Sequence, residues 1–427
     1  MNERKAALAA LERYRRSGEF SESALDRVIT SGGLDTREAA LCTRIVYCVL
    51  QNTALLDHCI ASYSTVPPKR LEPKVLDILR LSAAQLLFMD RIPKSAAVDE
   101  GVALCKTSDS KRASGLVNAV LRRISENAAS LPPIPGEGTA GYLATKYSHP
   151  LWLAELLLAE RGYDFTEAFF AANNTEPPIC AVVNTLKTDA ESLSLLLTER
   201  GAKVAHGQLS DCLLLQEVGR LTSLPEFLSG LFYIQDEAAR RAVLESGAAS
   251  GMNVLDACAA PGGKSFAAAI QMKNSGRIIA CDIGTKKLTK ISEGAARLGI
   301  DCIEARTMDA RTPDADLINF ADVVLADCPC SGMGVIRKKP EIRYKSEQEL
   351  LPLPEIQRAI LSGLAPCVKP GGVLLYSTCT VLKRENEDVV AAFLDTNPDF
   401  SAEKMQTYWP QIHGTDGFFI CKLIKST

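Results

Sequence analysis

The second half of the chain alternates short apolar stretches with helical segments, and this pattern constrains the fold more than any other feature. The apolar stretches are residues 253–257, 277–281, 322–326 and 372–376, and the helical segments are 264–272, 285–298, 354–368 and 384–396. Strands that alternate with helices predict an α/β domain whose parallel sheet is covered by helices on both faces. Because ligands bind such sheets beyond the carboxyl ends of the strands, we expect the functional residues directly after the strands.

The first part of the chain has a helical pattern. Residues 37–60 and 71–89 place apolar side chains three and four positions apart. The proline-rich residues 131–138 break this pattern and are typical of a linker. The sequence therefore predicts a multidomain chain with an all-α bundle at 1–130, a small α+β module at 140–231 and the α/β domain at 232–427.

The composition excludes several classes of protein. Of the 427 residues, 47% are hydrophobic and 23% are charged, which is typical of globular proteins and not of disordered ones. The sequence contains no run of 18 apolar residues, so it predicts no membrane-spanning helix. The 14 cysteines include no Cys-x-x-Cys pair and the 4 histidines are scattered. We therefore expect reduced thiols in a cytoplasmic protein that has neither a metal site nor a membrane partner.

The turn after the first strand of the α/β domain is rich in small residues and runs from Cys258 to Ser265. Small residues between a strand and a helix let a ligand approach the backbone near the positive end of the helix. One interpretation is a phosphate-binding P-loop, since Gly263-Lys264-Ser265 supplies its ending and Asp327 could bind magnesium. However, Cys258 stands where the P-loop needs its first glycine, and Pro261 lacks an N–H group.

The other interpretation of this turn is a nucleoside-binding site of a methyltransferase. Such a site needs an acid about 20 residues after the glycines to bind the ribose hydroxyls. Asp282 follows Gly262 by 20 residues, at the end of the second strand. Asp309 follows a third strand, which is expected between the stretches 277–281 and 322–326, and could reach the adenine amino group. The stretches 322–326 and 372–376 are then the fourth and fifth strands.

Two cysteines occur in polar turns after the fourth and fifth strands. Cys330 lies in Asp327-Cys-Pro-Cys-Ser-Gly332, and Cys379 lies in Tyr376-Ser-Thr-Cys-Thr380. Two thiols beside an acid and a nucleoside cofactor point to methylation of a pyrimidine. A thiolate that adds to carbon 6 makes carbon 5 nucleophilic enough to take a methyl group, and an acid such as Asp327 could bond the base.

These motifs resemble those of the Sun family of RNA cytosine-5 methyltransferases, in particular its bacterial 16S rRNA branch. The motifs are Asp256-Ala-Cys-Ala-Ala-Pro-Gly-Gly-Lys-Ser265, Asp327-Cys-Pro-Cys-Ser-Gly332 and Ser377-Thr-Cys-Thr380. The leading domain resembles the antitermination factor NusB in Arg37–Tyr47, Asp77–Leu87 and Gly115–Arg123. The resemblance implies a NusB-like bundle, the small module and a Rossmann-like methyltransferase domain that uses S-adenosylmethionine.

The resemblance also implies roles for individual residues. Cys379 matches the family's nucleophile, and Cys330 matches the cysteine that assists release of the RNA. The expected cofactor-binding residues are Cys258, Ala259, Ala260, Pro261, Gly262, Gly263, Lys264, Asp282, Asp309 and Asp327. Asp327 is also expected to face the target base. Cys328 departs from the family pattern, since many members have alanine there, and we expect no role for it. The implied partner of this monomeric enzyme is 16S rRNA or a small-subunit assembly intermediate.

A basic segment follows the Cys330 motif, with five cations within nine residues. Lys and Arg bind phosphates, and an aromatic ring can stack on a base. The predicted RNA-binding residues are Arg337, Lys338, Lys339, Arg343 and Tyr344, although a run of charges is also typical of a solvated face. A competing hypothesis is an RNA-binding or assembly protein in which the NusB-like domain matters more than catalysis. The intact Cys330 and Cys379 favour an enzyme.

Overall fold

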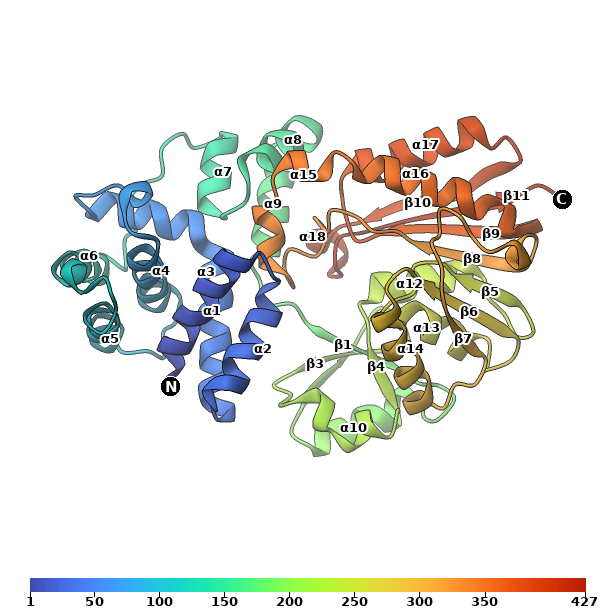
Figure 1. Ribbon diagram of the computed structural model, residues 1–427, viewed down its shortest axis with the longest axis horizontal. Helices are drawn as coiled ribbons and strands as arrows, with labels where there is room; N and C mark the ends of the chain where they lie inside the picture. Colours follow the sequence, from blue (N-terminus) through green and yellow to red (C-terminus); the bar gives the residue numbers. More distant parts are fainter. The chain divides into compact units, whose positions relative to one another are not determined.

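The computed structural model describes all 427 residues and divides the chain into two compact units (Figure 1). The first, called here the helical unit, contains residues 1–175 and 338–345. The second, called the sheet unit, contains residues 176–337 and 346–427. The predicted module at 140–231 is therefore divided between the units, because its first helices pack on the leading bundle and only its strands belong to the sheet unit.

The helical unit contains nine α-helices, of which the first six share one apolar core. They are α1 (Glu3–Ser17), α2 (Ser21–Gly32), α3 (Thr36–Tyr63), α4 (Pro73–Phe88), α5 (Lys94–Lys106), α6 (Ser114–Glu126), α7 (Ala140–Lys146), α8 (Leu151–Arg161) and α9 (Tyr163–Asn173). By length and composition α3 could cross a membrane, but Ile45, Leu56 and Ile60 are buried in the bundle core. Its apolar character is therefore explained by packing.

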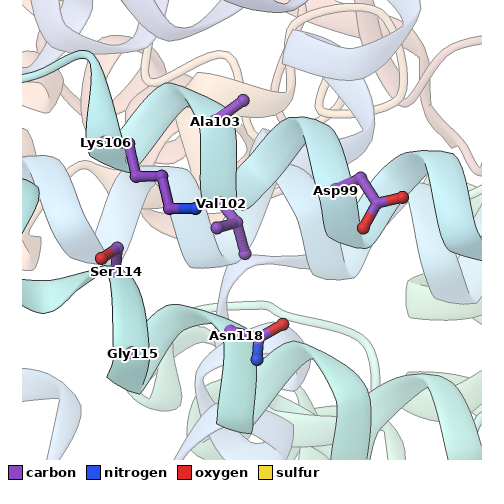
Figure 2. Close-up of a pocket in the computed structure, with 7 residues that line it drawn as sticks. All are labelled: Asp99, Val102, Ala103, Lys106, Ser114, Gly115 and Asn118. Atoms are coloured by element: carbon purple, nitrogen blue, oxygen red, sulfur yellow. The ribbon is translucent and has the colours of Figure 1, made fainter.

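A pocket of about 500 Å³ lies between α5 and α6 (Figure 2). Its walls include Asp99 and Lys106 from α5, and Ser114, Gly115 and Asn118 from α6. None of the predicted catalytic or cofactor-binding residues lines it.

Helix α3 contains a break, and residues that are distant in the sequence form hydrogen bonds with the backbone groups beside it. Asn52 has non-helical angles (φ −123°, ψ 17°), which interrupt the regular geometry of the helix. Beside this break Leu55 N donates to Ser148 Oγ at 3.1 Å, and Gln51 O accepts from Arg343 at 2.5 Å. Buried backbone groups need such partners, and a break in the helical ladder needs a stated cause.

Arg343 belongs to a strap, residues Lys338–Lys345, which is part of the helical unit and contains the short 3₁₀ helix η5 (Pro340–Tyr344). Its side chain is 1% exposed, and its guanidinium also donates to the carbonyl oxygens of Tyr147 and Ser148 and to Asn174 Oδ1. Burial lowers the pKa of Arg343 to about 10. The hydroxyl of Tyr344 donates to the carbonyl oxygen of Leu50, just before the break in α3.

The sheet unit contains two sheets. The smaller is antiparallel, in the order β2-β3-β1-β4, with β1 (Ile179–Val183), β2 (Lys203–His206), β3 (Cys212–Gln216) and β4 (Phe232–Ile234), and is accompanied by α10 (Ala190–Glu199) and α11 (Pro225–Leu228). The larger has the order β10-β11-β9-β8-β5-β6-β7. Its strands are β5 (Asn253–Asp256), β6 (Arg277–Asp282), β7 (Ile303–Thr307), β8 (Ala321–Asp327), β9 (Val368–Thr378), β10 (Phe400–Tyr408) and β11 (Phe418–Lys425).

The larger sheet confirms the predicted α/β fold, with one addition. Strands β5 to β9 are parallel. Strands β5, β6, β8 and β9 match the four predicted apolar stretches, whereas the bounds of β7 were not predicted. Strands β10 and β11 add an antiparallel hairpin at one edge. Figure 1 shows α16 and α17 on one face of the sheet and α12, α13 and α14 on the other. These helices are α12 (Glu237–Ser246), α13 (Gly263–Gln271), α14 (Thr285–Leu298), α16 (Leu353–Leu364) and α17 (Glu387–Thr396). The short helices α15 (Glu347–Leu350) and α18 (Pro410–His413) complete the unit.

The central strand β5 ends in a buried acid. Asp256 is 0% exposed and accepts a hydrogen bond of 2.6 Å from Ser265 Oγ, while its Oδ1 has no partner. Burial raises the pKa of Asp256 from 3.8 to about 7, although the bond from Ser265 opposes this shift. A carboxyl group in such a place is more stable when it carries a proton.

Replacement of Arg343 with methionine should destabilise the helical unit by roughly 3–5 kcal/mol, because several buried carbonyl oxygens lose their donor. Thermal unfolding of the full chain measures this effect. Arg122→Met is the control, since Arg122 is exposed and bonds Asn118 on its own helix. Equal unfolding midpoints for the two variants would contradict the role of the strap.

Asp256 should make the sheet unit less stable as the pH rises from about 4 to about 7. In this range the folded chain keeps a proton on Asp256 that the unfolded chain has lost, so the free energy of unfolding falls with pH, by roughly 4 kcal/mol at most. Asp256→Asn removes this dependence and keeps an acceptor for Ser265. The test is the difference in unfolding free energy between wild type and Asp256→Asn at several pH values.

Asp322→Asn is the control for this measurement. Burial acts against the charge of Asp322, but bonds from Lys369 and the Asn253 N–H outweigh it and lower the pKa of Asp322. The difference between wild type and Asp322→Asn should therefore stay constant between pH 5 and 7. A wild-type curve that Asp256→Asn leaves unchanged would rule out a titrating Asp256.

Candidate active site

The site lies where the chain changes direction across the larger sheet. From β5 the chain passes to β6 and β7 on one side, then returns to β8 and β9 on the other side. The carboxyl ends of β5 and β8 therefore form the switch point at which open α/β sheets bind ligands. The predicted residues Asp282, Asp327 and Cys379 all lie at this edge, at or just after the ends of β6, β8 and β9.

The turn from Cys258 to Lys264 forms a backbone cradle. Gly262 has a φ of +114°, and a Cβ atom there would lie 2.5 Å from the ring of Phe266. Helix α13 begins at Gly263 without a side-chain cap, so its first N–H groups face the turn. Such a helix end binds carboxylates and phosphates, which fits the carboxylate of the methionine part of S-adenosylmethionine.

The two further acids have different surroundings. Asp282 is 8% exposed and accepts from the N–H of Gly284 at 2.9 Å, so its carboxylate is held at the end of β6, in the position expected for binding ribose hydroxyls. Asp309 is paired with Arg311 through bonds of 2.6 and 3.0 Å, and this pair lowers the pKa of Asp309. An adenine amino group would share the carboxylate of Asp309 with Arg311.

Lys264 and Asp327 form an ion pair across the switch point. Lys264 Nζ donates to Asp327 Oδ2 at 2.6 Å, and Ser377 Oγ donates to Asp327 Oδ1 at 2.9 Å. The Lys264 side chain is 10% exposed and its ammonium lies 5.1 Å from the ring centre of Phe418. The pair brings a carboxylate, a cation and a hydroxyl to one point, where they can bond the polar edge of a base.

The two predicted thiols are in contact. Cys330 Sγ lies 3.3 Å from Cys379 Sγ, and both residues are partly exposed. The contact with Cys379, together with burial, holds the pKa of Cys330 well above its usual range. A thiol that keeps its proton can donate to a neighbouring thiolate, so the pair suits one nucleophile and one donor.

The basic segment is arranged differently from the prediction. Arg343 is buried in the helical unit, and Arg337 is 7% exposed with its guanidinium on Gly414 O and near Asp416. The structure thus gives both arginines a structural role in place of the predicted RNA contact, because their charges are already bound inside the protein. Tyr344 is 42% exposed although its hydroxyl is bonded to Leu50, and Lys339 is exposed beside Phe20.

Several residues of the site were not predicted from the sequence. Ser377, Phe418, Gln357, Glu385 and Asn386 contact the motifs, but only Ser377 lies within one. The register of β8 and β9 pairs Asp327 with Ser377, so the strand pairing would have revealed Ser377. The others come from elements whose neighbours the pattern does not specify.

Three family models match successive parts of the chain. The model of the NusB family matches residues 1–126, the ferredoxin-like domain model of RsmF/B-like methyltransferases matches 149–222, and the model of the 16S rRNA methyltransferase RsmB/F matches 247–424. These matches decide between the two interpretations of the glycine turn in favour of the methyltransferase. They also confirm the NusB-like bundle and the Rossmann-like domain.

Relatives of similar length extend the match to the whole chain. A Bacillus subtilis relative is 36% identical over 99% of this chain and 98% of its own length. The ribosomal RNA small subunit methyltransferase B of Pseudomonas putida is 33% identical and covers 100% of this chain and 99% of itself. The solved structure of the protein PH0851 is 29% identical, covers 99% of both chains and has a TM-score of 0.82. The chain therefore belongs to the 16S rRNA methyltransferase RsmB/F family and joins a NusB-like domain to an S-adenosylmethionine-dependent, Rossmann-like methyltransferase domain.

Proposed function

We propose that this rRNA methyltransferase methylates carbon 5 of a cytosine in 16S rRNA through a covalent bond between Cys379 and carbon 6 of the base. The observation that carries the proposal is the contact of the Cys330 and Cys379 sulfurs, 3.3 Å apart, at the same sheet edge as the Lys264–Asp327 pair. Methylation at a nitrogen or at a ribose oxygen needs no thiol. A thiol pair at the switch point is therefore best explained by attack on a pyrimidine ring.

The cytosine must leave the base stack before the thiol can reach it. Asp327 and Lys264 supply an acceptor and a donor for the polar edge of the ring, and Ser377 keeps the carboxylate of Asp327 in place. The Cys379 thiolate adds to carbon 6, and the electron pair moves onto carbon 5 and the polar edge of the ring. The positive charge of Lys264 stabilises this negative charge.

Bound S-adenosylmethionine supplies an electrophilic methyl group beside carbon 5. The residues that would hold it are the turn Cys258–Lys264 for its methionine part, Asp282 for the ribose and Asp309 for the adenine. Solvent water then takes the carbon 5 proton, and the electron pair of that C–H bond restores the ring and expels Cys379 as a thiolate. Cys330 contacts the departing sulfur, so its S–H group stabilises the thiolate and favours release of the RNA.

The RNA path and the cellular setting follow from this proposal. Lys338 and Lys339 remain the proposed phosphate contacts of the basic segment, together with the exposed ring of Tyr344. The substrate is 16S rRNA or a small-subunit assembly intermediate, and the monomeric protein acts in the cytoplasm without a metal ion.

Cys379→Ala should lower methylation of a 16S rRNA fragment by at least about 10³-fold, because the covalent route is lost. Tritium release from cytosine labelled at carbon 5 measures the reaction. Cys302→Ala is the matched control, since Cys302 is also a partly exposed free thiol of the same unit and lies just before β7. A thermal shift with S-adenosylhomocysteine should be the same in both variants, and methylation by Cys379→Ala at the wild-type rate would refute the proposal.

Cys330→Ala should accumulate a covalent protein–RNA complex, because the expelled thiolate loses the donor that stabilises it. A denaturing gel with labelled RNA and S-adenosylmethionine shows the complex as a band of slower mobility. The double variant Cys330→Ala/Cys379→Ala should show no such band. Loss of turnover in Cys330→Ala without this band would mean that Cys330 acts before the bond to RNA forms.

A further inference from the structure

Three buried polar side chains lie behind the two thiol turns and have no part in the mechanism above. They are Gln357 from α16, Glu385 from the 3₁₀ helix η7 (Lys383–Glu385) and Asn386, the residue after it. All three are 0% exposed. Polar groups are buried at a cost in free energy unless they are bonded, so their bonds show what they hold.

Gln357 and Glu385 hold the residues on either side of Cys330. Glu385 Oε2 accepts from the N–H of Ser331 at 2.8 Å, and Gln357 Nε2 donates to the carbonyl oxygen of Pro329 at 3.0 Å. A bond of 3.0 Å from Gln357 Nε2 to Glu385 Oε2 joins the two side chains. The backbone of the Cys330 turn is therefore fixed both before and after the thiol.

Asn386 holds the residues on either side of Cys379 in the same manner. Its Oδ1 accepts from Thr378 Oγ1 at 2.6 Å, and its Nδ2 donates to the carbonyl oxygen of Thr380 at 3.1 Å. A hydrogen bond of 2.7 Å between Ser331 Oγ and Thr380 Oγ1 connects the two turns. Because Glu385 and Asn386 are adjacent in the chain, one short segment fixes both thiols.

Glu385 also places a buried carboxylate beside the Cys330 turn. Its bonds come from neutral donors, the Ser331 N–H and the Gln357 amide, and its Oε1 has no partner. The contact with Cys379 and burial raise the pKa of Cys330 most, and the negative charge of Glu385 adds to this effect. The other ionisable groups near the Cys330 thiol are Asp327, Cys328 and Tyr376. The charge of Asp327 is balanced by its ion pair with Lys264.

We propose that Glu385 is a positioning residue that, with Gln357 and Asn386, fixes the two sulfurs and assigns their roles. The charge of Glu385 adds to the burial and the Cys379 contact that keep the proton on Cys330, so Cys379 is the sulfur that ionises and attacks. The inference rests on the proposed covalent mechanism. It also explains why a carboxylate is buried without a cation, since a paired carboxylate would lose its influence on the nearby thiol.

Glu385→Gln is the decisive variant, because the amide oxygen can still accept from Ser331 while the charge is lost. We expect alkylation of the free enzyme by iodoacetamide at pH 8 to increase about tenfold at Cys330 relative to Cys379, which corresponds to about one pKa unit. The labelled peptides are counted by mass spectrometry. We also expect kcat to fall about tenfold, with the KM for RNA and the binding of S-adenosylhomocysteine within twofold of wild type.

Glu387→Gln is the matched control, because Glu387 is two residues away and is bonded to Thr407 of β10 instead of a thiol turn. The Glu387→Gln variant should have the same ratio of Cys330 to Cys379 alkylation as wild type, and the same kcat. Asn386→Ala removes bonds but no charge, so it should lower kcat and leave the labelling ratio unchanged. A Glu385→Gln variant with the wild-type labelling ratio would overturn the inference.

Wild type provides a second test that does not depend on the variants folding. Across a pH series, Cys379 must be alkylated at a lower pH than Cys330, and identical profiles for the two thiols would also overturn the inference. Labelling is measured without RNA or methyl transfer. A failure of the covalent mechanism, seen as active Cys379→Ala, is therefore distinguishable from a failure of the role of Glu385.

Discussion

The larger sheet can bring its reactive groups together only because the chain reverses its course between β5 and β8. The segments after β5 and β8 leave the sheet toward opposite sides, and open α/β sheets bind ligands in the space between such segments. The Lys264–Asp327 pair spans this space, with Lys264 from the first turn of α13 and Asp327 from the end of β8. A largely buried ammonium needs a partner, so the pair both closes the switch point and leaves a polar group for a base.

The sequence predicted the parts of the site that depend on local chemistry. A glycine turn, an acid after the next strand and two thiol turns are each visible within a few residues, and strand alternation places them at one edge. Ser377 and Phe418 could not be predicted in this way, because their roles depend on strand register and on the hairpin of β10 and β11.

Arg343 shows why a charge run is a weak predictor of RNA contact. Its partners are carbonyl oxygens of Gln51, Tyr147 and Ser148, which are about 200 to 300 positions away in the chain. One of these, the oxygen of Gln51, lies directly before the break in α3 at Asn52. The sequence pattern is the same for an arginine that binds RNA phosphates and for one that binds carbonyl oxygens of the protein. Only the folded structure distinguishes these two cases. The same holds for Glu385, which looks from the sequence like an ordinary acid at the start of a helix.

The protein must also prevent its other sulfurs from competing at this edge. Cys328 stands in the same turn as Cys330, but it is 4% exposed and its pKa is held well above the usual range, first by burial and then by a bond with Cys258. A buried neutral thiol is a poor nucleophile and behaves as a small apolar side chain. The position of each cysteine within the turn therefore decides whether its thiol can react. Cys328 packs in the apolar core, whereas Cys330, two residues later in the same turn, contacts Cys379.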